Sequence, residues 1–400
     1  MNVLIADKLP EYCIDDLKKL GLNVTSNPGL TADDLKNVLH EYSILVVRST
    51  KVNADAIKSG KKLSLIIRAG AGVNNIDLKT ASSYGIYVAN CPGKNSIAVA
   101  ELAMGHIIAL DRKIPDNVMD FRNGTWNKAL YSKATGLYGR KIGVIGMGQI
   151  GSELLERARS FGMELYAWSR SLTPEKAEDM EINYCKSVDE LIDTCDIISI
   201  HVALTDDTRG MIDATRISKM KPGAFFINTS RAEVVDEDAL IDALKEGKIS
   251  AGLDVFSDEP EFKQGEFKSR FDGVPNVYIT HHTGASTVQA QNAVADAVVE
   301  IVDKYINEGH VMNWVNRCES TDAKWQLVVR HFDKPGVIAN VMTDLKAANI
   351  NAEEFQNVIF AGKIAACCTI QLSSEPSEEI LSSIRGRTDE VISVDLIQLN

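Results

Sequence analysis

A glycine-rich turn in the middle of the chain limits the possible folds more than any other feature of the sequence. The turn follows the apolar run 141–146 and opens a segment, 149–162, whose apolar residues recur at helical spacing. It contains Gly146, Gly148, Gln149, Ile150 and Gly151. Glycines at this spacing allow a tight turn, close approach of the backbone to a pyrophosphate and close helix packing, and the helix N-terminus stabilises negative charge. We therefore predict a strand, a turn and a helix that bind a dinucleotide through these residues.

The glycine turn lies inside a long alternation of apolar runs and helical patterns. This alternation extends from 141 to 256 and is typical of a doubly wound parallel sheet. The same alternation occupies 2–90, so a separate parallel α/β layer precedes the turn. We expect the long helical pattern after Ser286 to return the chain to that first layer and to make its domain discontinuous.

The C-terminal part of the chain has a different pattern. A polar stretch, 312–324, precedes runs in the order strand, helix, strand, strand, helix, strand, which is typical of a small ferredoxin-like domain. The predicted fold class is α/β, with two doubly wound parallel-sheet domains and this ferredoxin-like domain. The expected boundaries are 1–94 with 285–314 for the discontinuous domain, 95–284 for the inserted Rossmann domain, 315–324 for a linker and 325–400 for the last domain.

Composition excludes several other classes of protein. The chain of 400 residues is 45% hydrophobic and 24% charged, and it has no apolar run of about 18 residues that could span a bilayer. Its net charge of −12 disfavours nucleic acid and anionic membranes as partners. The N-terminus reads directly into an apolar run without a basic region, so we expect a cytoplasmic protein. Seven scattered cysteines without a CxxC pair indicate reduced thiols.

The second apolar run of the Rossmann domain ends without the acid that is usual there. An Asp or Glu at this place holds the ribose hydroxyls of NAD, but here the run ends at Trp168 and is followed by Ser169 and Arg170. Without a negative charge, Ser169 and Arg170 can donate hydrogen bonds to the 2′-phosphate of NADP. Alternatively, Arg170 stacks on the adenine or points to solvent, so both cofactors stay open.

Three polar residues each follow an apolar run that we predict to be a strand of this domain. They are Arg231, Glu259 and His282. The carboxyl ends of parallel strands meet at one edge of the sheet, where doubly wound folds bind their ligands. A base, a carboxylate that orients it and an arginine that binds a carboxylate substrate are the groups that hydride transfer from a 2-hydroxy acid needs.

Several motifs from Ala69 to Thr287 together resemble one family. They are RAGAGVNNID, NCPGKNSIAVAEL, GRKIGVIGMGQIG, MKPGAFFINTSRAEVVDEDAL, GLDVFSDEP and HHTGAST. Through them the chain resembles the D-isomer-specific 2-hydroxyacid dehydrogenases, and 325–400 resembles an ACT domain, a small regulatory module. The resemblance implies that Arg231, Glu259 and His282 are catalytic, that NAD is the cofactor, and that the assembly is a homodimer or homotetramer. It also implies oxidation of 3-phospho-D-glycerate to 3-phosphooxypyruvate, which opens L-serine biosynthesis.

The resemblance also assigns binding residues. Arg48 and Lys128 match cations associated with the substrate phosphate, and Arg68 is a further candidate; the alternative for each is a solvated surface cation. The other matches are the backbone of Ala71, Gly72 and Val73 with Asn95 for the substrate carboxylate, Asp254 for the cofactor carboxamide, Gly284 for the cofactor, and Trp126 for contact with another subunit.

Two positions beside the implied catalytic histidine depart from the family pattern. His281 stands where proline is usual, and Thr283 replaces an aliphatic residue. The choice of His282 over His281 therefore rests on spacing to Gly284. No metal is expected at the paired histidines, because the other histidines show no ligand spacing.

In the ACT-like segment, the resemblance implies a binding site for an effector. His331, Asp333 and Asn351 match positions that bind serine between paired ACT domains. Asp333 stands where asparagine is usual, and an aspartate cannot donate to a carboxylate. L-serine is therefore the expected effector with weakened affinity, and a domain that only dimerises is the alternative.

Two other functions stay open. An NADPH-dependent glyoxylate or hydroxypyruvate reductase would suit Ser169 and Arg170, but its substrates lack the phosphate that Arg48 and Lys128 would bind. A dinucleotide-sensing protein like the corepressors that share this fold would not need a serine-sensing domain. Turnover of any 2-hydroxy acid would exclude the purely binding role.

Overall fold

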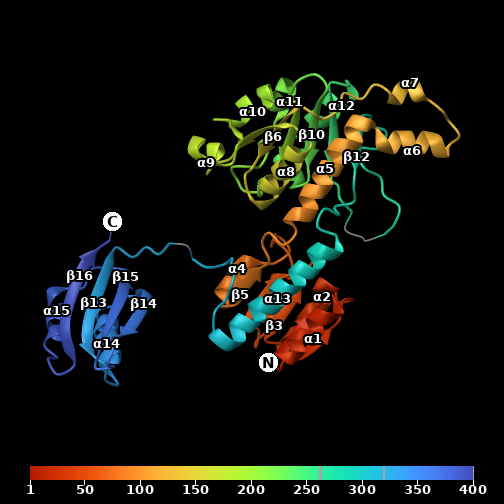
Figure 1. Cartoon of the computed structure of the whole chain (residues 1–400). Coiled ribbons are helices and arrows are strands. Elements are labelled where there is room, and N and C mark those ends of the chain that lie inside the picture. The colour runs from red at the N-terminus through yellow and green to blue at the C-terminus, as the bar shows by residue number, and fades with distance from the viewer. Residues whose placement is uncertain (261–263, 319, 400) are drawn as a thin grey trace. The chain divides into compact units, whose positions relative to one another are not determined.

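The protein is described from a computed structural model that covers residues 1–260, 264–318 and 320–399 (Figure 1). Its chain divides into two compact units, Met1–Asn316 and Arg317–Asn400. The division falls inside the stretch 315–324 that the sequence predicts as a linker.

The first unit begins with a five-stranded parallel sheet. Its strands are β1 (Asn2–Ile5), β2 (Asn23–Ser26), β3 (Ile44–Val47), β4 (Leu65–Arg68) and β5 (Tyr87–Asn90), in the order β2-β1-β3-β4-β5. The helices between them are α1 (Glu11–Lys19), α2 (Ala32–Val38), the 3₁₀ helix η1 (Leu39–Glu41), α3 (Ala54–Ser59) and α4 (Leu78–Ser83). Every residue of β3 is buried, as expected for a parallel strand covered on both faces.

The helix α13 (Val288–Glu308) packs on this sheet, although almost two hundred residues separate the two in sequence (Figure 1). Val298 and Ile301 of α13 are buried in one apolar cluster with Val3 and Ile5 of β1. This is the contact that a discontinuous first domain requires. The domain boundaries inside the first unit stay a prediction.

A seven-stranded parallel sheet completes the first unit. Its strands are β6 (Lys141–Ile145), β7 (Glu164–Trp168), β8 (Asn183–Tyr184), β9 (Ile197–Ile200), β10 (Ala224–Asn228), β11 (Ile249–Leu253) and β12 (Val277–Ile279), in the order β12-β11-β10-β9-β6-β7-β8. Its connections contain α8 (Gln149–Ser160), α9 (Pro174–Asp179), α10 (Val188–Thr194), α11 (Ala214–Lys219), the 3₁₀ helix η2 (Ala232–Val234) and α12 (Glu237–Lys245). The strand order reverses at β6, and doubly wound folds bind ligands at such a reversal.

Three helices join the two sheets. They are α5 (Ser96–Arg112), α6 (Ile114–Arg122) and α7 (Lys128–Tyr131). Ala103 and Ile107 of α5 are buried against Ile142 and Val144 of β6. In contrast, α7 lies on a loop that extends away from the seven-stranded sheet (Figure 1), and Trp126 just before it is 79% exposed.

The second unit is an antiparallel sheet with two helices. Its elements are β13 (Trp325–Phe332), α14 (Val337–Ala347), β14 (Ala352–Ile359), β15 (Ala365–Leu372), α15 (Glu378–Arg385) and β16 (Val391–Gln398), and the strand order is β14-β15-β13-β16. Alternate residues of β15 are buried, because only one face of the sheet is covered by helices. The predicted ferredoxin-like domain is confirmed, and so is the fold class of two parallel α/β sheets with this third domain.

None of the helices in 1–260, 264–318 and 320–399 is long and apolar enough to cross a membrane.

Candidate functional site

A cavity of about 1050 Å³ in the first unit is lined by residues from both parallel sheets. Arg48 and Arg68 reach it from the carboxyl ends of β3 and β4, and Glu259 and His282 reach it from the loops after β11 and β12. The cavity therefore lies at strand ends, where parallel α/β folds bind ligands. His281 also lines it, beside His282.

His282 and Glu259 form a hydrogen-bonded pair at this cavity. Nδ1 of His282 lies 2.7 Å from Oε2 of Glu259. The other carboxylate oxygen of Glu259 accepts a hydrogen bond from the backbone N–H of Phe256 at 3.1 Å, which fixes the carboxylate. A histidine held at Nδ1 by a carboxylate has its Nε2 available for proton transfer.

The loop that carries His282 is held by a buried aspartate. His282 has φ +50, a left-handed conformation that is uncommon for a residue with a side chain. The carboxylate of Asp254 accepts hydrogen bonds from Thr280 Oγ1, from the Thr283 N–H at 2.9 Å and from the Gly284 N–H at 2.8 Å. Asp254 thus holds the Thr280 side chain before His282 and two backbone N–H groups after it. Its predicted contact with a cofactor carboxamide, like that of Gly284 with the cofactor, stays a prediction.

The pair changes the titration of the histidine. The hydrogen bond to Glu259 raises the pKa of His282 above its ordinary value, while burial and the charge of Arg231 act in the opposite direction. Stabilisation of the imidazolium is what a base needs when it accepts a proton from an alcohol.

Three arginines carry positive charge near the His282–Glu259 pair. Burial lowers the pKa of Arg68, and the charges of Arg231 and Arg48 lower it further. The Arg231 guanidinium lies against Gly72, where an added Cβ would be 2.7 Å from Nη2. Three guanidinium groups that share a region suit a substrate with more than one negative charge.

The structure adds two residues to this end of the cavity that the sequence analysis missed. Asp7, directly after β1, is 5% exposed and accepts hydrogen bonds from the backbone N–H groups of Arg48, Ser49 and Thr50 at 2.7 to 3.0 Å. Asp7 therefore fixes the loop that presents Arg48. Lys8 lines the cavity as a further cation. Both residues follow a predicted strand of the first sheet, so the rule used for Arg231 would have found them.

The other residues predicted to bind the substrate lie partly inside and partly outside the lining of this cavity. Asn95 lines the cavity. Ala71, Gly72 and Val73 form the loop after β4, and the Asn90 side chain donates a hydrogen bond to the Ala71 carbonyl oxygen at 2.5 Å. Like Ala71, Gly72 and Val73, Lys128 is not among the residues that line the cavity of its own chain, and it is exposed on α7.

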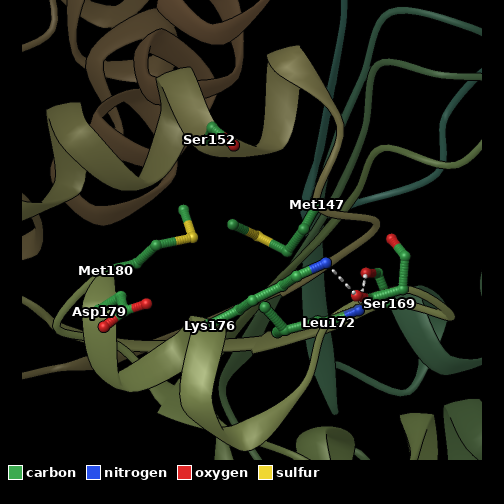
Figure 2. A pocket seen from close by; sticks show the side chains of 8 residues that line it. Met147, Ser152, Ser169, Leu172, Lys176, Asp179 and Met180 are labelled. Atoms are coloured by element: carbon green, nitrogen blue, oxygen red, sulfur yellow. Dashed lines mark hydrogen bonds between the residues drawn. The ribbon is translucent and has the colours of Figure 1, made fainter.

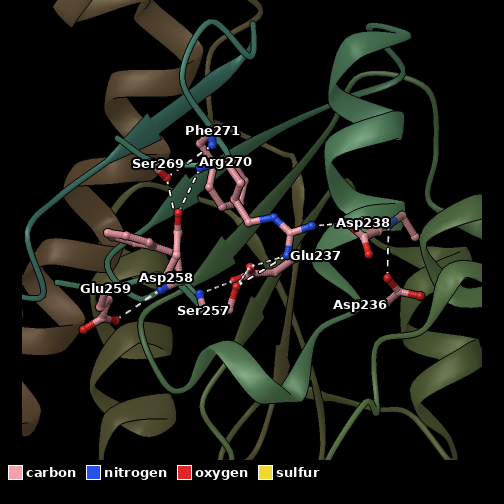
Figure 3. A network of polar contacts seen from close by, with 11 residues as sticks. Asp236, Glu237, Asp238, Ser257, Asp258, Glu259, Ser269, Arg270 and Phe271 are labelled. Carbon is pink, nitrogen blue, oxygen red and sulfur yellow. Dashed lines mark hydrogen bonds and ion pairs between the residues drawn. The ribbon is translucent and has the colours of Figure 1, made fainter. Parts of the chain in front are cut away.

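A polar network fixes the loop that carries Glu259 (Figure 3). Glu237, at the start of α12, is 8% exposed and accepts hydrogen bonds from the N–H and the hydroxyl of Ser257. Arg270 forms ion pairs with Glu237 and Asp238, and its N–H donates to Asp258 at 2.9 Å. No local pattern in the sequence predicts this network, because its members are distant in the chain.

The glycine turn has the geometry of a nucleotide cradle. Gly146 has φ +104, and a Cβ there would lie 2.6 Å from the His201 carbonyl oxygen; a Cβ at Gly151 would lie 2.2 Å from the Gly146 carbonyl oxygen. At Gly148 an added Cβ would meet nothing within 4 Å, so this backbone is open to a ligand. The N-terminus of α8, with Gln149 and Ile150 as its first residues, begins at this open position.

Buried polar atoms at the strand ends of both sheets also fit a bound ligand. In the described part of the first unit, Arg68 Nε, His201 Nδ1 and Thr229 Oγ1 are buried without a hydrogen-bond partner. Each residue lies at or just after the carboxyl end of a strand, and this edge of a parallel sheet is where ligands bind. Buried polar groups are normally paired, so partners from a ligand suit them.

At the end of β7, Ser169 and Arg170, which the sequence predicts to bind the cofactor together, have different partners. The Ser169 hydroxyl accepts a hydrogen bond from the Leu172 N–H at 3.1 Å. The exposed guanidinium of Arg170 lies 3.4 Å from the carboxylate of Asp207.

In the second unit the three predicted effector residues differ in exposure. The ring of His331 is 2% exposed, with Nδ1 at 2.7 Å from the Phe332 carbonyl oxygen and Nε2 at 3.1 Å from Asn357 Oδ1. Asp333 and Asn351 are exposed, and Asn351 donates to Glu353 at 2.9 Å.

Comparison with known proteins agrees with this arrangement. Residues 104–284 match the family model of the D-isomer specific 2-hydroxyacid dehydrogenase, NAD binding domain. The chain is 36% identical over 367 residues to D-3-phosphoglycerate dehydrogenase of Methanocaldococcus jannaschii, covering 91% of this chain and 68% of that protein. It is 41% identical over 295 residues to hydroxypyruvate reductase of Thermotoga maritima, covering 73% and 92%.

A solved structure has the same fold over most of the chain. It is the NAD⁺-bound 3-phosphoglycerate dehydrogenase of Entamoeba histolytica, with a TM-score of 0.66 and 26% identity over 79% of this chain and 99% of that one. The chain belongs to the D-isomer-specific 2-hydroxyacid dehydrogenase family. It is an NAD(P)-dependent oxidoreductase that resembles D-3-phosphoglycerate dehydrogenases over most of its length, and its second unit is consistent with an ACT domain.

Proposed function

We propose that this enzyme oxidises 3-phospho-D-glycerate to 3-phosphooxypyruvate, the first step of L-serine biosynthesis. The observation that carries the proposal is one cavity that holds both the His282–Glu259 pair and the cations Arg48 and Arg68. The pair suits removal of a hydroxyl proton, and the cations suit a substrate that carries a phosphate and a carboxylate.

Each residue has a defined part in this reaction. Nε2 of His282 accepts the proton of the C2 hydroxyl, while Glu259 stabilises the imidazolium that forms. Arg231, with the loop 71–73 and Asn95, binds the carboxylate and stabilises negative charge on the developing carbonyl. The nicotinamide supplies the chemistry of hydride acceptance.

The phosphate is assigned to Arg48, with Arg68 beside it. An Arg guanidinium presents a fork of N–H donors that matches phosphate oxygens. Lys128 lies outside the cavity of its own chain, so we assign it to the phosphate in a second copy. Trp126 is exposed and matches a family residue that contacts another subunit. Both points support such an assembly, a homodimer or homotetramer.

A reductase acting on hydroxypyruvate or glyoxylate is the second candidate. Two observations favour it: the 41% identity to a hydroxypyruvate reductase, and the absence of an acid directly after β7, where Ser169 and Arg170 stand. We propose that NAD is the main cofactor and that NADP is also accepted, because no carboxylate at Ser169 repels a 2′-phosphate.

Initial rates distinguish these functions. We expect 3-phosphoglycerate with NAD to give the highest kcat/KM, and hydroxypyruvate or glyoxylate with NADH or NADPH to give lower values. Higher kcat/KM on the unphosphorylated acids would establish the reductase instead. Absence of turnover with every acid would leave only a dinucleotide-binding role.

Arg48→Ala is expected to weaken 3-phosphoglycerate selectively. Loss of one charge-assisted hydrogen-bonding group should raise KM by about 10- to 100-fold for 3-phosphoglycerate and by less than about threefold for D-glycerate. Lys58→Ala, which removes an exposed cation of α3, is the control and should change neither value. Equal losses on both substrates would refute the phosphate assignment.

Glu259→Gln is expected to change the pH dependence of the reaction. His282 must be neutral to accept a proton, so oxidation is lost as pH falls through its pKa. Because the bond to Glu259 raises this pKa, the substitution should move the acidic limb of kcat/KM to lower pH. The maximum should fall by about 10- to 100-fold, as for loss of one charge-assisted hydrogen bond.

The exposed Glu246 at the end of α12 provides the control for this experiment. Glu246→Gln should leave both the limb and the maximum unchanged. An acidic limb that stays in place in Glu259→Gln would mean that His282 is not the group that titrates.

For the ACT domain we propose L-serine as an effector, held at His331, Asp333 and Asn351 between paired domains. Serine at such a site would contact two subunits and restrict their relative motion, so inhibition would be allosteric. Calorimetry and rates at high serine concentration test this. Absence of both binding and inhibition would leave the domain a role in assembly or in binding another effector.

A further inference from the structure

A second cavity, of about 350 Å³, lies at the end of β7 beside the nucleotide cradle (Figure 2). Met147 from the glycine turn and Ser152 from the first turn of α8 line one side of it. The other lining residues follow β7 or belong to α9 and its end: Ser169, Ser171, Leu172, Lys176, Asp179 and Met180. In a Rossmann domain this place receives the 2′ position of the adenosine ribose.

The polar groups in this cavity are arranged with the positive charge toward β7. Figure 2 shows the ammonium end of Lys176 reaching toward Ser169, while Asp179 lies at the opposite end of the lysine side chain. The ammonium donates to the Ser171 carbonyl oxygen at 3.4 Å. In the part of the chain that the structure describes, no carboxylate forms an ion pair with Lys176, although Asp179 lines the same cavity. Its charge is therefore available to an anion.

Arg170, the cation that follows β7 directly in the sequence, is placed differently. It does not line this cavity, and its guanidinium lies 3.4 Å from Asp207. Both groups are more than 70% exposed, so the pair is weak, but it directs the Arg170 side chain toward another loop.

We propose that Lys176, with the hydroxyls of Ser169 and Ser171, binds the 2′-phosphate of NADP and is the residue that permits use of this cofactor. A phosphate dianion is bound well by an ammonium group and by hydroxyl donors. The Ser169 hydroxyl accepts from Leu172, so its own proton is available for a phosphate oxygen. The inference rests on the cofactor site proposed above and assigns its specificity to a residue of α9.

Equilibrium binding tests the proposal without turnover. Calorimetry measures dissociation constants of NADPH, NADH, adenosine 2′,5′-bisphosphate and adenosine 5′-monophosphate for the full chain and its variants. Lys176→Ala should weaken NADPH and the bisphosphate by about 10- to 100-fold, the effect of one charge-assisted contact. NADH and the monophosphate should change by less than about twofold. Lys176→Arg, which keeps the charge, should retain most of the affinity for NADPH.

Lys186→Ala is the matched control, because it removes an exposed cation of the same domain that lies outside the cavity. It should leave all dissociation constants within about twofold. If Arg170→Ala weakens NADPH and Lys176→Ala does not, the proposal is wrong and Arg170 is the phosphate contact. Equal weakening of NADH and NADPH by Lys176→Ala would show a structural role and also overturn it.

The wild-type protein separates this inference from the proposed function. If it binds NADH but neither NADPH nor the bisphosphate, the assignment of Lys176 fails. The proposed function is then tested separately by the rate of 3-phosphoglycerate oxidation with NAD. If NADPH binds as expected but no hydroxy acid is turned over, the proposed function fails and the assignment of Lys176 stands.

Discussion

Replacement of His282 by alanine is expected to reduce kcat by ~10²–10⁴-fold, the usual contribution of a positioned acid or base. Nδ1 of His282 is held at 2.7 Å by Glu259, and the loop around it is held by Asp254, so its Nε2 is the group that the cavity presents for proton transfer. The dissociation constant for NADH should change little, because the glycine cradle belongs to a different loop. Stopped-flow or steady-state rates and a separate binding titration provide both measurements.

His281→Ala is the matched control for this prediction. His281 lines the same cavity and precedes His282 directly, but it has no hydrogen bond to Glu259 among the described contacts. We expect a change in kcat of less than about threefold. A severe loss in His281→Ala with a mild one in His282→Ala would move the catalytic role to the neighbouring residue.

Replacement of Arg231 by alanine is expected to reduce kcat/KM by ~10²–10³-fold, the loss typical of removing one donor that stabilises transition-state charge. The guanidinium of Arg231 lies against Gly72 in the loop predicted to hold the substrate carboxylate, and its charge acts on both His282 and Arg68. Its proposed role is to bind the carboxylate and also the developing oxyanion, so both kcat and KM should worsen.

Two further variants define the role of Arg231. Arg231→Lys keeps the charge but loses the planar fork, so it should restore less than about a tenth of the wild-type kcat/KM. Arg209→Ala removes an exposed arginine of the same domain and should have no effect. Wild-type kcat/KM in Arg231→Ala on every acid would contradict its assignment to the carboxylate.

The sequence predicted the elements of this protein well because their signals are local. Apolar runs of parallel strands, the helical spacing after the glycine turn, and the order of elements in 325–400 all depend on neighbours within about a dozen residues. The rule that ligands bind at strand ends also selected Glu259 and His282 before any contact between them was known. The same rule, applied to the first sheet, would have given Asp7 and Lys8.

Tertiary structure decided which of the candidate side chains line the same cavity. Arg170 and Lys176 differ by only six positions, and both are exposed cations, yet one lies beside Asp207 and the other lines the cavity at the end of β7. Lys128 has the charge expected of a phosphate contact, but α7 places it outside the cavity of its own chain.

The sequence alone therefore determined the two parallel sheets, the ferredoxin-like domain, the family and the type of reaction. Only the folded chain decided that Asp254 holds the His282 loop, that Glu237 and Arg270 hold the Glu259 loop, and that α9 supplies a cation to the cavity at the end of β7. The physical reason is that propensity and periodicity act between near neighbours in the chain. Hydrogen bonds and ion pairs act across a few ångströms of space, between residues that the chain brings together only when its sheets and helices pack.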